Sequence, residues 1–441
     1  MSKNTLIKGT IILTATGFLT RFIGFFFRSF LSHTFGEEQV GLYQFIFPIY
    51  ALCFSLSSAG IETSLARCVA QKIAKGKKKE ADQTLYQAIF ISLFISFVLI
   101  FLVRRYATYL SIYILGDLRC ETLLRSIVLS LPFASIHSCI CGYYLGRKET
   151  KIPAISQLIE QVARVSIVYI IYMIFTKNNQ TPTIELAVWG IILGEIASTL
   201  FCAHYYLKRT HEPLVPGVFS QKSHLTNEIL SLAIPITSSR VLMNLLQSIE
   251  CISIPLCLQA HGNSNSVALS TYGVLTGMAL PCIMFPTAVT NSISTILLPT
   301  VAEIEAESNL LRLKMLIRKV IIFGFGLGSI CGVIFLIFGK LVGMILFRST
   351  MAGDFIRTLA WICPFLYVNN TLISILNGLG KARTSFTIHI YSLAIRIFAV
   401  WYGISRFGMN GYLWGLLISQ LLVSVLCISK LGNYIEKREL F

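Results

Sequence analysis

The chain has 441 residues, of which 55% are hydrophobic and 13% charged, and its formal net charge is +17. Soluble domains carry about 25% charged residues, and a soluble chain this apolar would lack the polar surface needed to cover its core. These values exclude soluble enzymes, disordered proteins and small disulfide scaffolds. They predict an all-α polytopic membrane protein, because apolar runs of about 20 residues, the length that crosses a bilayer as a helix, recur from end to end.

Twelve such runs predict about twelve transmembrane helices. The first contains Arg21 and Arg28 and is not followed by a small-residue cleavage site, so it is predicted to be a membrane helix rather than a signal peptide. The predicted spans lie near residues 6–32, 40–71, 84–104, 122–145, 153–175, 185–207, 228–257, 267–299, 316–338, 355–377, 385–404 and 412–430.

Basic residues gather in alternate connections between these spans. About 22 Lys and Arg residues fall at the N-terminus and in one set of loops, against about seven in the opposite set, and cytoplasmic loops carry such an excess. The bias predicts a multi-pass protein of the bacterial cell membrane with both termini in the cytoplasm. It also explains the net charge without a nucleic-acid partner.

An internal repeat divides the chain. The segment Tyr144–Lys151 is similar to Gly378–Ser385, about 234 positions later, and the span after each copy carries one arginine, Arg164 or Arg396. Six spans separate the copies, so two parallel six-helix halves are predicted, a common plan among transporters. The predicted domains are an N-terminal half (1–207), a cytoplasmic linker (208–227), a C-terminal half (228–431) and a cytoplasmic tail (432–441).

Ionisable side chains inside spans are costly and are therefore candidates for function. Arg21 and Arg28 are seven residues apart, or about 20° around a helix, and form a basic stripe. Arg28 is also close enough to the predicted outer interface to snorkel to it. Glu62, in the second span, is predicted either to bind a proton or cation or to act as a counter-charge for Arg21. Glu160 and Arg164, four apart, are predicted to satisfy each other.

The seventh span carries a polar stripe at steps of four, three and four, with Glu250 beside it, and the eighth contains Pro281 and Pro286, which predict a kink. Striped helices opening both halves predict a water-filled cavity, and its arginines favour an anionic ligand. The stripe consists of Arg240, Asn244, Gln247 and Cys251. The predicted substrate-binding residues are Arg21, Arg28, Arg240, Asn244, Gln247 and Asn291, and the predicted ion-coupling or charge-balancing residues are Glu62 and Glu250.

Enzyme, metal and cofactor sites are not predicted. The three Asp residues lie in or beside predicted loops, so no Asp-rich motif can hold Mg²⁺ against a diphosphate, and no HExxH, GxSxG or Walker sequence occurs. The twelve Cys are scattered without a CxxC pair, which is typical of small apolar side chains rather than of a metal site or a disulfide framework.

Three N-terminal segments, Lys3–Leu13, Thr20–Phe25 and Phe35–Tyr43, resemble the polysaccharide-transporter branch of the multidrug/oligosaccharidyl-lipid/polysaccharide (MOP) exporter superfamily. The resemblance implies a MATE-like fold whose halves rock by alternating access. It implies a flippase for a lipid-linked saccharide such as the undecaprenyl-pyrophosphate-linked peptidoglycan precursor lipid II, serving spore cortex synthesis. Membrane lipids and cortex peptidoglycan synthases are the implied partners.

Thr20-Arg-Phe-Ile-Gly-Phe25 resembles the Ser-Arg-Val-Leu-Gly-Phe pattern of related lipid II flippases, whose arginine lines the cavity, and this role carries over to Arg21. Their second arginine falls one position from Arg28. The chain departs from the family at Gly60-Ile-Glu62, where relatives usually have Gly-Leu-Pro, and in having twelve rather than fourteen predicted spans.

Two other functions remain open from the sequence. A multidrug or cation antiporter of the same superfamily would need a net acidic cavity, which the arginine stripes disfavour. A non-transporting scaffold that recruits cortex synthases would depend on its loops rather than on its membrane residues.

Overall fold

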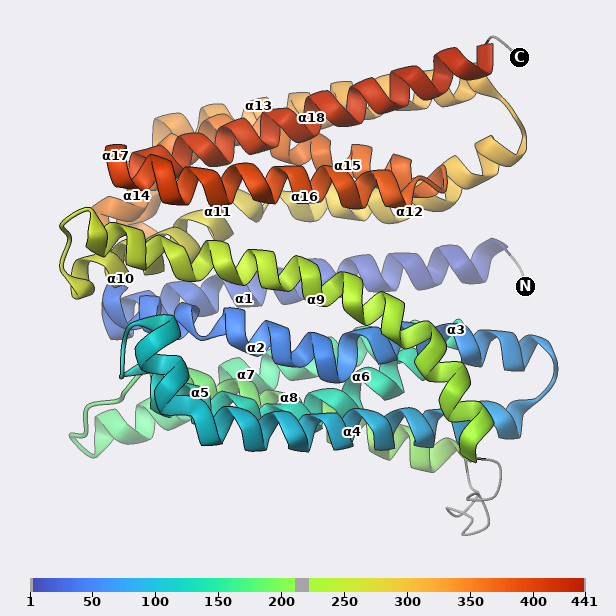
Figure 1. Ribbon diagram of the computed structural model, residues 1–441, viewed down its shortest axis with the longest axis horizontal. Helices are drawn as coiled ribbons and strands as arrows, with labels where there is room; N and C mark the ends of the chain where they lie inside the picture. The colour runs from blue at the N-terminus through green and yellow to red at the C-terminus, as the bar shows by residue number, and fades with distance from the viewer. Residues whose placement is uncertain (1–2, 211–221, 440–441) are drawn as a thin grey trace. The chain divides into compact units, whose positions relative to one another are not determined.

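The computed structural model describes residues 3–210 and 222–439, and the regular structure in these ranges is helical (Figure 1). Most of the predicted linker 208–227 lies outside the described residues. The helices are α1 (Lys3–Phe45), α2 (Phe47–Phe54), α3 (Gly60–Ala74), α4 (Lys78–Tyr109), α5 (Cys120–Ile127), α6 (Leu131–Gly146), α7 (Lys151–Lys177), α8 (Glu185–Thr210), α9 (Lys222–Ala260), α10 (Asn265–Gly273), α11 (Leu280–Met284), α12 (Thr287–Ala306), α13 (Leu310–Phe347), α14 (Thr350–Leu359), α15 (Cys363–Gly378), α16 (Ala382–Phe398), α17 (Ser405–Phe407) and α18 (Met409–Glu439).

The prediction of an all-α, multi-pass membrane protein with about twelve spans is confirmed. The described residues contain eleven helical stretches long and apolar enough to cross a membrane. The first, Thr14–Ala74, combines the first two predicted spans, and the chain leaves helical geometry between them at Gly36 (φ 78°). The predicted break of the eighth span is also confirmed, since α11 ends at Met284 and α12 begins after Pro286.

The chain packs as two compact units that differ from the predicted halves in two segments. The first unit comprises Met1–Phe27 and Leu42–Ser248, and the second comprises Arg28–Gly41 and Ile249–Phe441. Helices α1 and α9 therefore contribute residues to both units. The predicted boundaries at 207 and 228 follow the order of the chain, whereas the packing assigns most of α9 to the first unit.

Each unit has a core built from equivalent helices. In the first unit, buried side chains of α3, α4, α6 and α8 pack together, and in the second unit those of α12, α13, α15 and α18 do so. Representative members are Leu65, Leu85, Tyr143 and Cys202 in the first core and Val301, Leu313, Leu372 and Cys427 in the second.

The internal repeat is visible in the local geometry of the two units. A 3₁₀ turn (Val128–Ser130) precedes α6, and an equivalent turn (Ala360–Ile362) precedes α15. Both helices have a proline at their second residue, Pro132 or Pro364, where the missing N–H has no intrahelical partner to lose. Each of these features recurs 232 positions later in the chain.

The same spacing relates two close helix contacts. A Cβ added at Gly146 would lie 2.5 Å from the carbonyl oxygen of Ala66 on α3, and one added at Gly378 would lie 2.9 Å from that of Leu298 on α12. Both glycines let backbones approach more closely than any side chain permits. The structural register of the repeat is thus 232, because 146 pairs with 378 and 66 with 298.

This register corrects the 234-residue offset predicted from the sequence, which had matched Gly146 to Gly380. In the structure, Gly380 (φ 71°) instead takes the position of Lys148 (φ 63°), in the turn after the helix. Glycine adopts this left-handed geometry without strain, whereas an L side chain is destabilised there by about 1–2 kcal/mol. The sequence match therefore paired two glycines that serve different purposes.

We predict that Gly146→Ala lowers the unfolding midpoint of the purified protein, because the new methyl group forces α6 away from α3. Overpacking of this kind costs about 1–3 kcal/mol. Gly326→Ala on α13 is the matched control, since a Cβ there meets nothing within 4 Å, and alanine should leave the midpoint unchanged or raise it slightly. Equal midpoints for the two variants would contradict the proposed contact.

Candidate functional site

A line of polar contacts joins α9 to the segment Pro48–Thr63 within the first unit. The Nη2 of Arg240 donates to the Oγ1 of Thr63 (2.9 Å), and the amide of Asn244 donates to Ser55, which lies in a π-helical segment, Ser55–Ala59. One turn further, Ser248 donates to a backbone carbonyl of α2 (3.1 Å). Two predicted site residues therefore face the same neighbouring helix segment.

The residues of α9 that make these contacts are four positions apart and do not follow the whole predicted stripe. The contacts continue from Asn244 to Ser248, whereas Gln247 is exposed beside them. The sequence predicts Gln247 as a site residue, whereas in the structure Ser248 makes the contact. A serine that donates to a carbonyl of the neighbouring helix gives no distinct signal in sequence.

Glu62 on α3 lies against Gly142 of α6, where an added Cβ would be 3.1 Å from the Cγ of Glu62. Arg240 and His137 are the neighbouring residues that act on it electrostatically, and Arg240 carries a permanent positive charge. Its nearby cation is thus on α9. The predicted alternative, a pairing with Arg21, is not found in the first unit, where Arg21 is exposed and makes no hydrogen bond or ion pair with the described residues.

A second, buried polar cluster in the first unit was not selected from the sequence. His137 on α6 contacts Glu195 on α8 through Nδ1 (3.3 Å) and Ser156 on α7 through Nε2 (2.9 Å). The predicted pair of Glu160 and Arg164 is confirmed beside it. His137 and Glu195 both lie inside predicted spans, and ionisable side chains at such positions indicate functional candidates in the sequence itself.

The segment Arg28–Gly41 is fixed within the second unit. Arg28, which is partly buried, donates from Nη1 to the carbonyl of Thr276 (3.1 Å). Ser29 and Ser32 donate to backbone carbonyls at the end of α13, Ser32 to Phe347 over 2.8 Å. Arg21 and Arg28, predicted as one stripe, therefore belong to different units.

Glu250 is buried in the second unit with two partners. Its side chain lies 3.3 Å from the Nη2 of Arg396 on α16, and the hydroxyl of Tyr412 on α18 donates to it over 2.6 Å. Glu250 is 2% exposed, so this carboxylate is screened from solvent. Asn291 on α12 is partly buried, and its side chain makes no hydrogen bond with the described residues.

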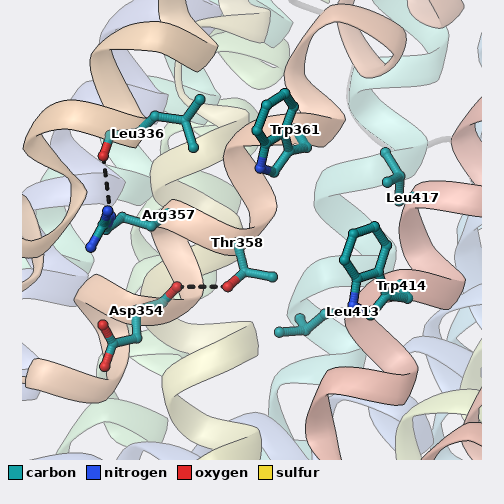
Figure 2. Close-up of a pocket in the computed structure, with 8 residues that line it drawn as sticks. All are labelled: Leu336, Asp354, Arg357, Thr358, Trp361, Leu413, Trp414 and Leu417. Atoms are coloured by element: carbon teal, nitrogen blue, oxygen red, sulfur yellow. Dashed lines mark hydrogen bonds between the residues drawn. The ribbon is translucent and has the colours of Figure 1, made fainter.

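A groove of about 360 Å³ lies between α13, α14 and α18 in the second unit (Figure 2). Trp361 and Trp414, each 59% exposed, line it with three leucines, and Arg357 donates to the carbonyl of Leu336 (3.1 Å). Exposed tryptophans of this kind are typical of membrane interfaces. None of the predicted site residues lines this groove.

Comparison with known proteins gives consistent results. A family model described as polysaccharide biosynthesis protein matches residues 6–305. Stage V sporulation protein B of Bacillus subtilis is 29% identical over 87% of this chain and 74% of that protein. Lipid II flippase MurJ of the same organism is 20% identical over 68% of this chain and 58% of that protein.

The fold matches a solved structure along nearly its whole length. An inward-facing multidrug resistance MATE family transporter of the MOP superfamily superimposes with a TM-score of 0.74 and 16% sequence identity, covering 95% of each chain. The MATE-like fold predicted from the sequence is therefore confirmed.

We predict that Arg396→Met destabilises the protein by about 3–5 kcal/mol, because it leaves the buried carboxylate of Glu250 without its cation. The double variant Glu250→Gln/Arg396→Met should be more stable than Arg396→Met alone. Lys77→Met serves as a control, since its partner Glu80 is on the surface and such pairs contribute less than about 1 kcal/mol. Unfolding midpoints that rank the double variant lowest would contradict the pairing.

Proposed function

The chain belongs to the polysaccharide biosynthesis protein family, a family of membrane transporters, and from this premise we propose that it is a flippase for a lipid-linked saccharide. The proposed substrate is the undecaprenyl-pyrophosphate-linked peptidoglycan precursor lipid II, moved across the bacterial cell membrane by alternating access. The proposed setting is the synthesis of spore cortex, with peptidoglycan synthases as partners.

The observation that carries this proposal is the exposure of Arg21 and Arg240 within apolar helical stretches. Both side chains are exposed, although Thr14–Ala74 and Ile229–Ala260 are long and apolar enough to span a membrane. A guanidinium at membrane depth is costly against lipid, so such groups normally face water or an anionic partner. A pyrophosphate offers the paired oxygens that the guanidinium fork binds best.

We propose different roles for the remaining predicted site residues. Glu250 is neutralised by Arg396 and is proposed to balance charge rather than to bind a coupling ion. Glu62 lies near Arg240, so a bound pyrophosphate would compete with it for this cation, and we propose Glu62 as the group that exchanges a proton or cation during transport. Asn244 and Gln247 are proposed to contact the saccharide or the phosphates beside Arg240. Arg28 is proposed to be a weaker phosphate ligand, and Asn291 on α12 is proposed to contact the substrate as well.

The names of the relatives support the narrower substrate. One is a sporulation protein and another a lipid II flippase. The Thr20–Phe25 motif resembles that of such flippases, and this resemblance implies a place in the cavity for Arg21. The solved structure of a multidrug transporter has the same fold as this chain, and this likeness gives no information about the substrate. An antiporter of that kind is disfavoured here because the exposed ionisable residues of the proposed site are arginines.

We predict that Arg21→Ala and Arg240→Ala each reduce flipping by about tenfold or more, since a charge-assisted hydrogen bond contributes about 1.5–3 kcal/mol. Sporulating cells depleted of the protein should accumulate lipid II on the cytoplasmic side, and only the wild-type chain should relieve this. Arg105→Ala, exposed at the predicted outer end of the third span, is the matched control and should behave as wild type.

Two results would contradict the proposal. If both arginine variants fold in the membrane and relieve the accumulation fully, the arginines do not bind substrate. If depletion leaves lipid II unchanged, the substrate is another lipid-linked glycan, or the antiporter and scaffold alternatives apply.

We also predict that both termini lie in the cytoplasm, because basic residues are concentrated on that side. A green fluorescent protein fused after the last residue should fluoresce, whereas alkaline phosphatase fused there should be inactive. Phosphatase inserted at Gly408, in the predicted outer connection before α18, should be active. The opposite pattern would reverse the proposed orientation.

A further inference from the structure

We propose that the first unit contains a zinc site formed by His137, Cys141 and Cys202. The imidazole nitrogen and the two thiol sulfurs lie within 4.8 Å of one another. All three residues are buried, with exposures of 8%, 7% and 0%. A tetrahedral zinc ion with Zn–S bonds of about 2.3 Å separates its sulfurs by about 3.8 Å, so small side-chain shifts suffice to close the site.

The helices bring the ligands together in a fixed way. His137 and Cys141 are four residues apart on α6 and therefore share one face of that helix. Cys202 comes from α8, 61 residues further along the chain than Cys141. This distance explains why the cysteine spacing in the sequence gave no indication of a metal site, and a bound ion would join α6 to α8.

The hydrogen bonds of His137 suit it to metal ligation. Its Nδ1 faces the carboxylate of Glu195 (3.3 Å), which can accept a proton from that nitrogen and leave Nε2 free to ligate. A carboxylate that orients a ligating histidine in this manner is a regular feature of zinc sites. Nε2 lies 2.9 Å from the hydroxyl of Ser156, which is itself 3.5 Å from the sulfur of Cys141. Ser156 is thus the available fourth ligand, or it rotates away in favour of water.

The charge balance of the site favours this set of ligands and a zinc ion. Two thiolates and one neutral imidazole neutralise a divalent cation, which favours Zn²⁺ over Cu⁺ in a membrane segment where net charge is costly. The nearby acidic alternative, formed by His137, Glu160 and Glu195, contains a carboxylate already paired with Arg164. Binding releases the two thiol protons, so affinity falls with decreasing pH.

The fold itself does not require these ligands. At the 232-residue spacing of the repeat, Asn369 and Ile373 stand where the first unit has His137 and Cys141. Asn369 there joins α15 to α18 by hydrogen bonds with Gln420 (2.9 Å) and Ser424 (2.7 Å). The second unit therefore holds the equivalent helices with neutral polar groups, and the thiol and imidazole set is specific to the first.

The test is metal binding by the full-length protein, purified in detergent under anaerobic reducing conditions without a histidine tag. Zn²⁺ should bind at about one equivalent per chain, and Co²⁺ in its place should give a thiolate-to-cobalt charge-transfer band. Cys141→Ser, Cys202→Ser and His137→Asn should abolish the band. Glu195→Gln should weaken binding about 10- to 100-fold, as loss of an orienting carboxylate does.

Matched controls are Cys139→Ser, two residues away on α6, and Cys427→Ser in the second unit, both of which replace fully buried cysteines. These variants should bind metal like the wild type and elute as the same folded species. Absence of the band in wild type, its persistence in the Cys141→Ser/Cys202→Ser double variant, its equal loss in Cys139→Ser, or recovery of a Cys141–Cys202 disulfide instead of bound metal would overturn the proposal.

Discussion

A polar side chain inside an apolar helix must find its partner in the protein, in water or in a bound ligand, because lipid offers none. This constraint accounts for the interactions that organise both units. Arg164 and Arg396, separated by 232 positions, occupy equivalent places, yet the first pairs with Glu160 on its own helix and the second with Glu250 on α9. The two units therefore share the arrangement of their helices and the position of this arginine, but they differ in the carboxylate that neutralises it.

The features that the sequence predicted well are those that depend on composition or on short spacing. The all-helical membrane fold follows from the length and frequency of apolar runs, the break between α11 and α12 from Pro286, and the pair of Glu160 and Arg164 from a step of four. Each of these needs information from only one helix. The structure agrees with all three.

The features that the sequence could not supply involve contacts between helices. Nothing in the spacing of Glu62 shows that Arg240 rather than Arg21 is nearby, and nothing in α9 distinguishes Ser248 from Gln247. In the repeat, Gly378 and Gly380 are two residues apart and chemically identical. Only their geometry, close packing for one and a left-handed turn for the other, separates them.

The division of α1 and α9 between the units has a mechanical consequence. The chain passes from one unit to the other at three places, between residues 27 and 28 and between 41 and 42 in α1 and between 248 and 249 in α9, and each crossing lies within a helix. A loop would absorb a change in orientation by rotating its backbone, whereas a helix resists through its hydrogen bonds and must bend. Any reorientation of one unit is therefore transmitted to the other as bending of α1 and α9, close to where Arg28 and Asn244 make their contacts.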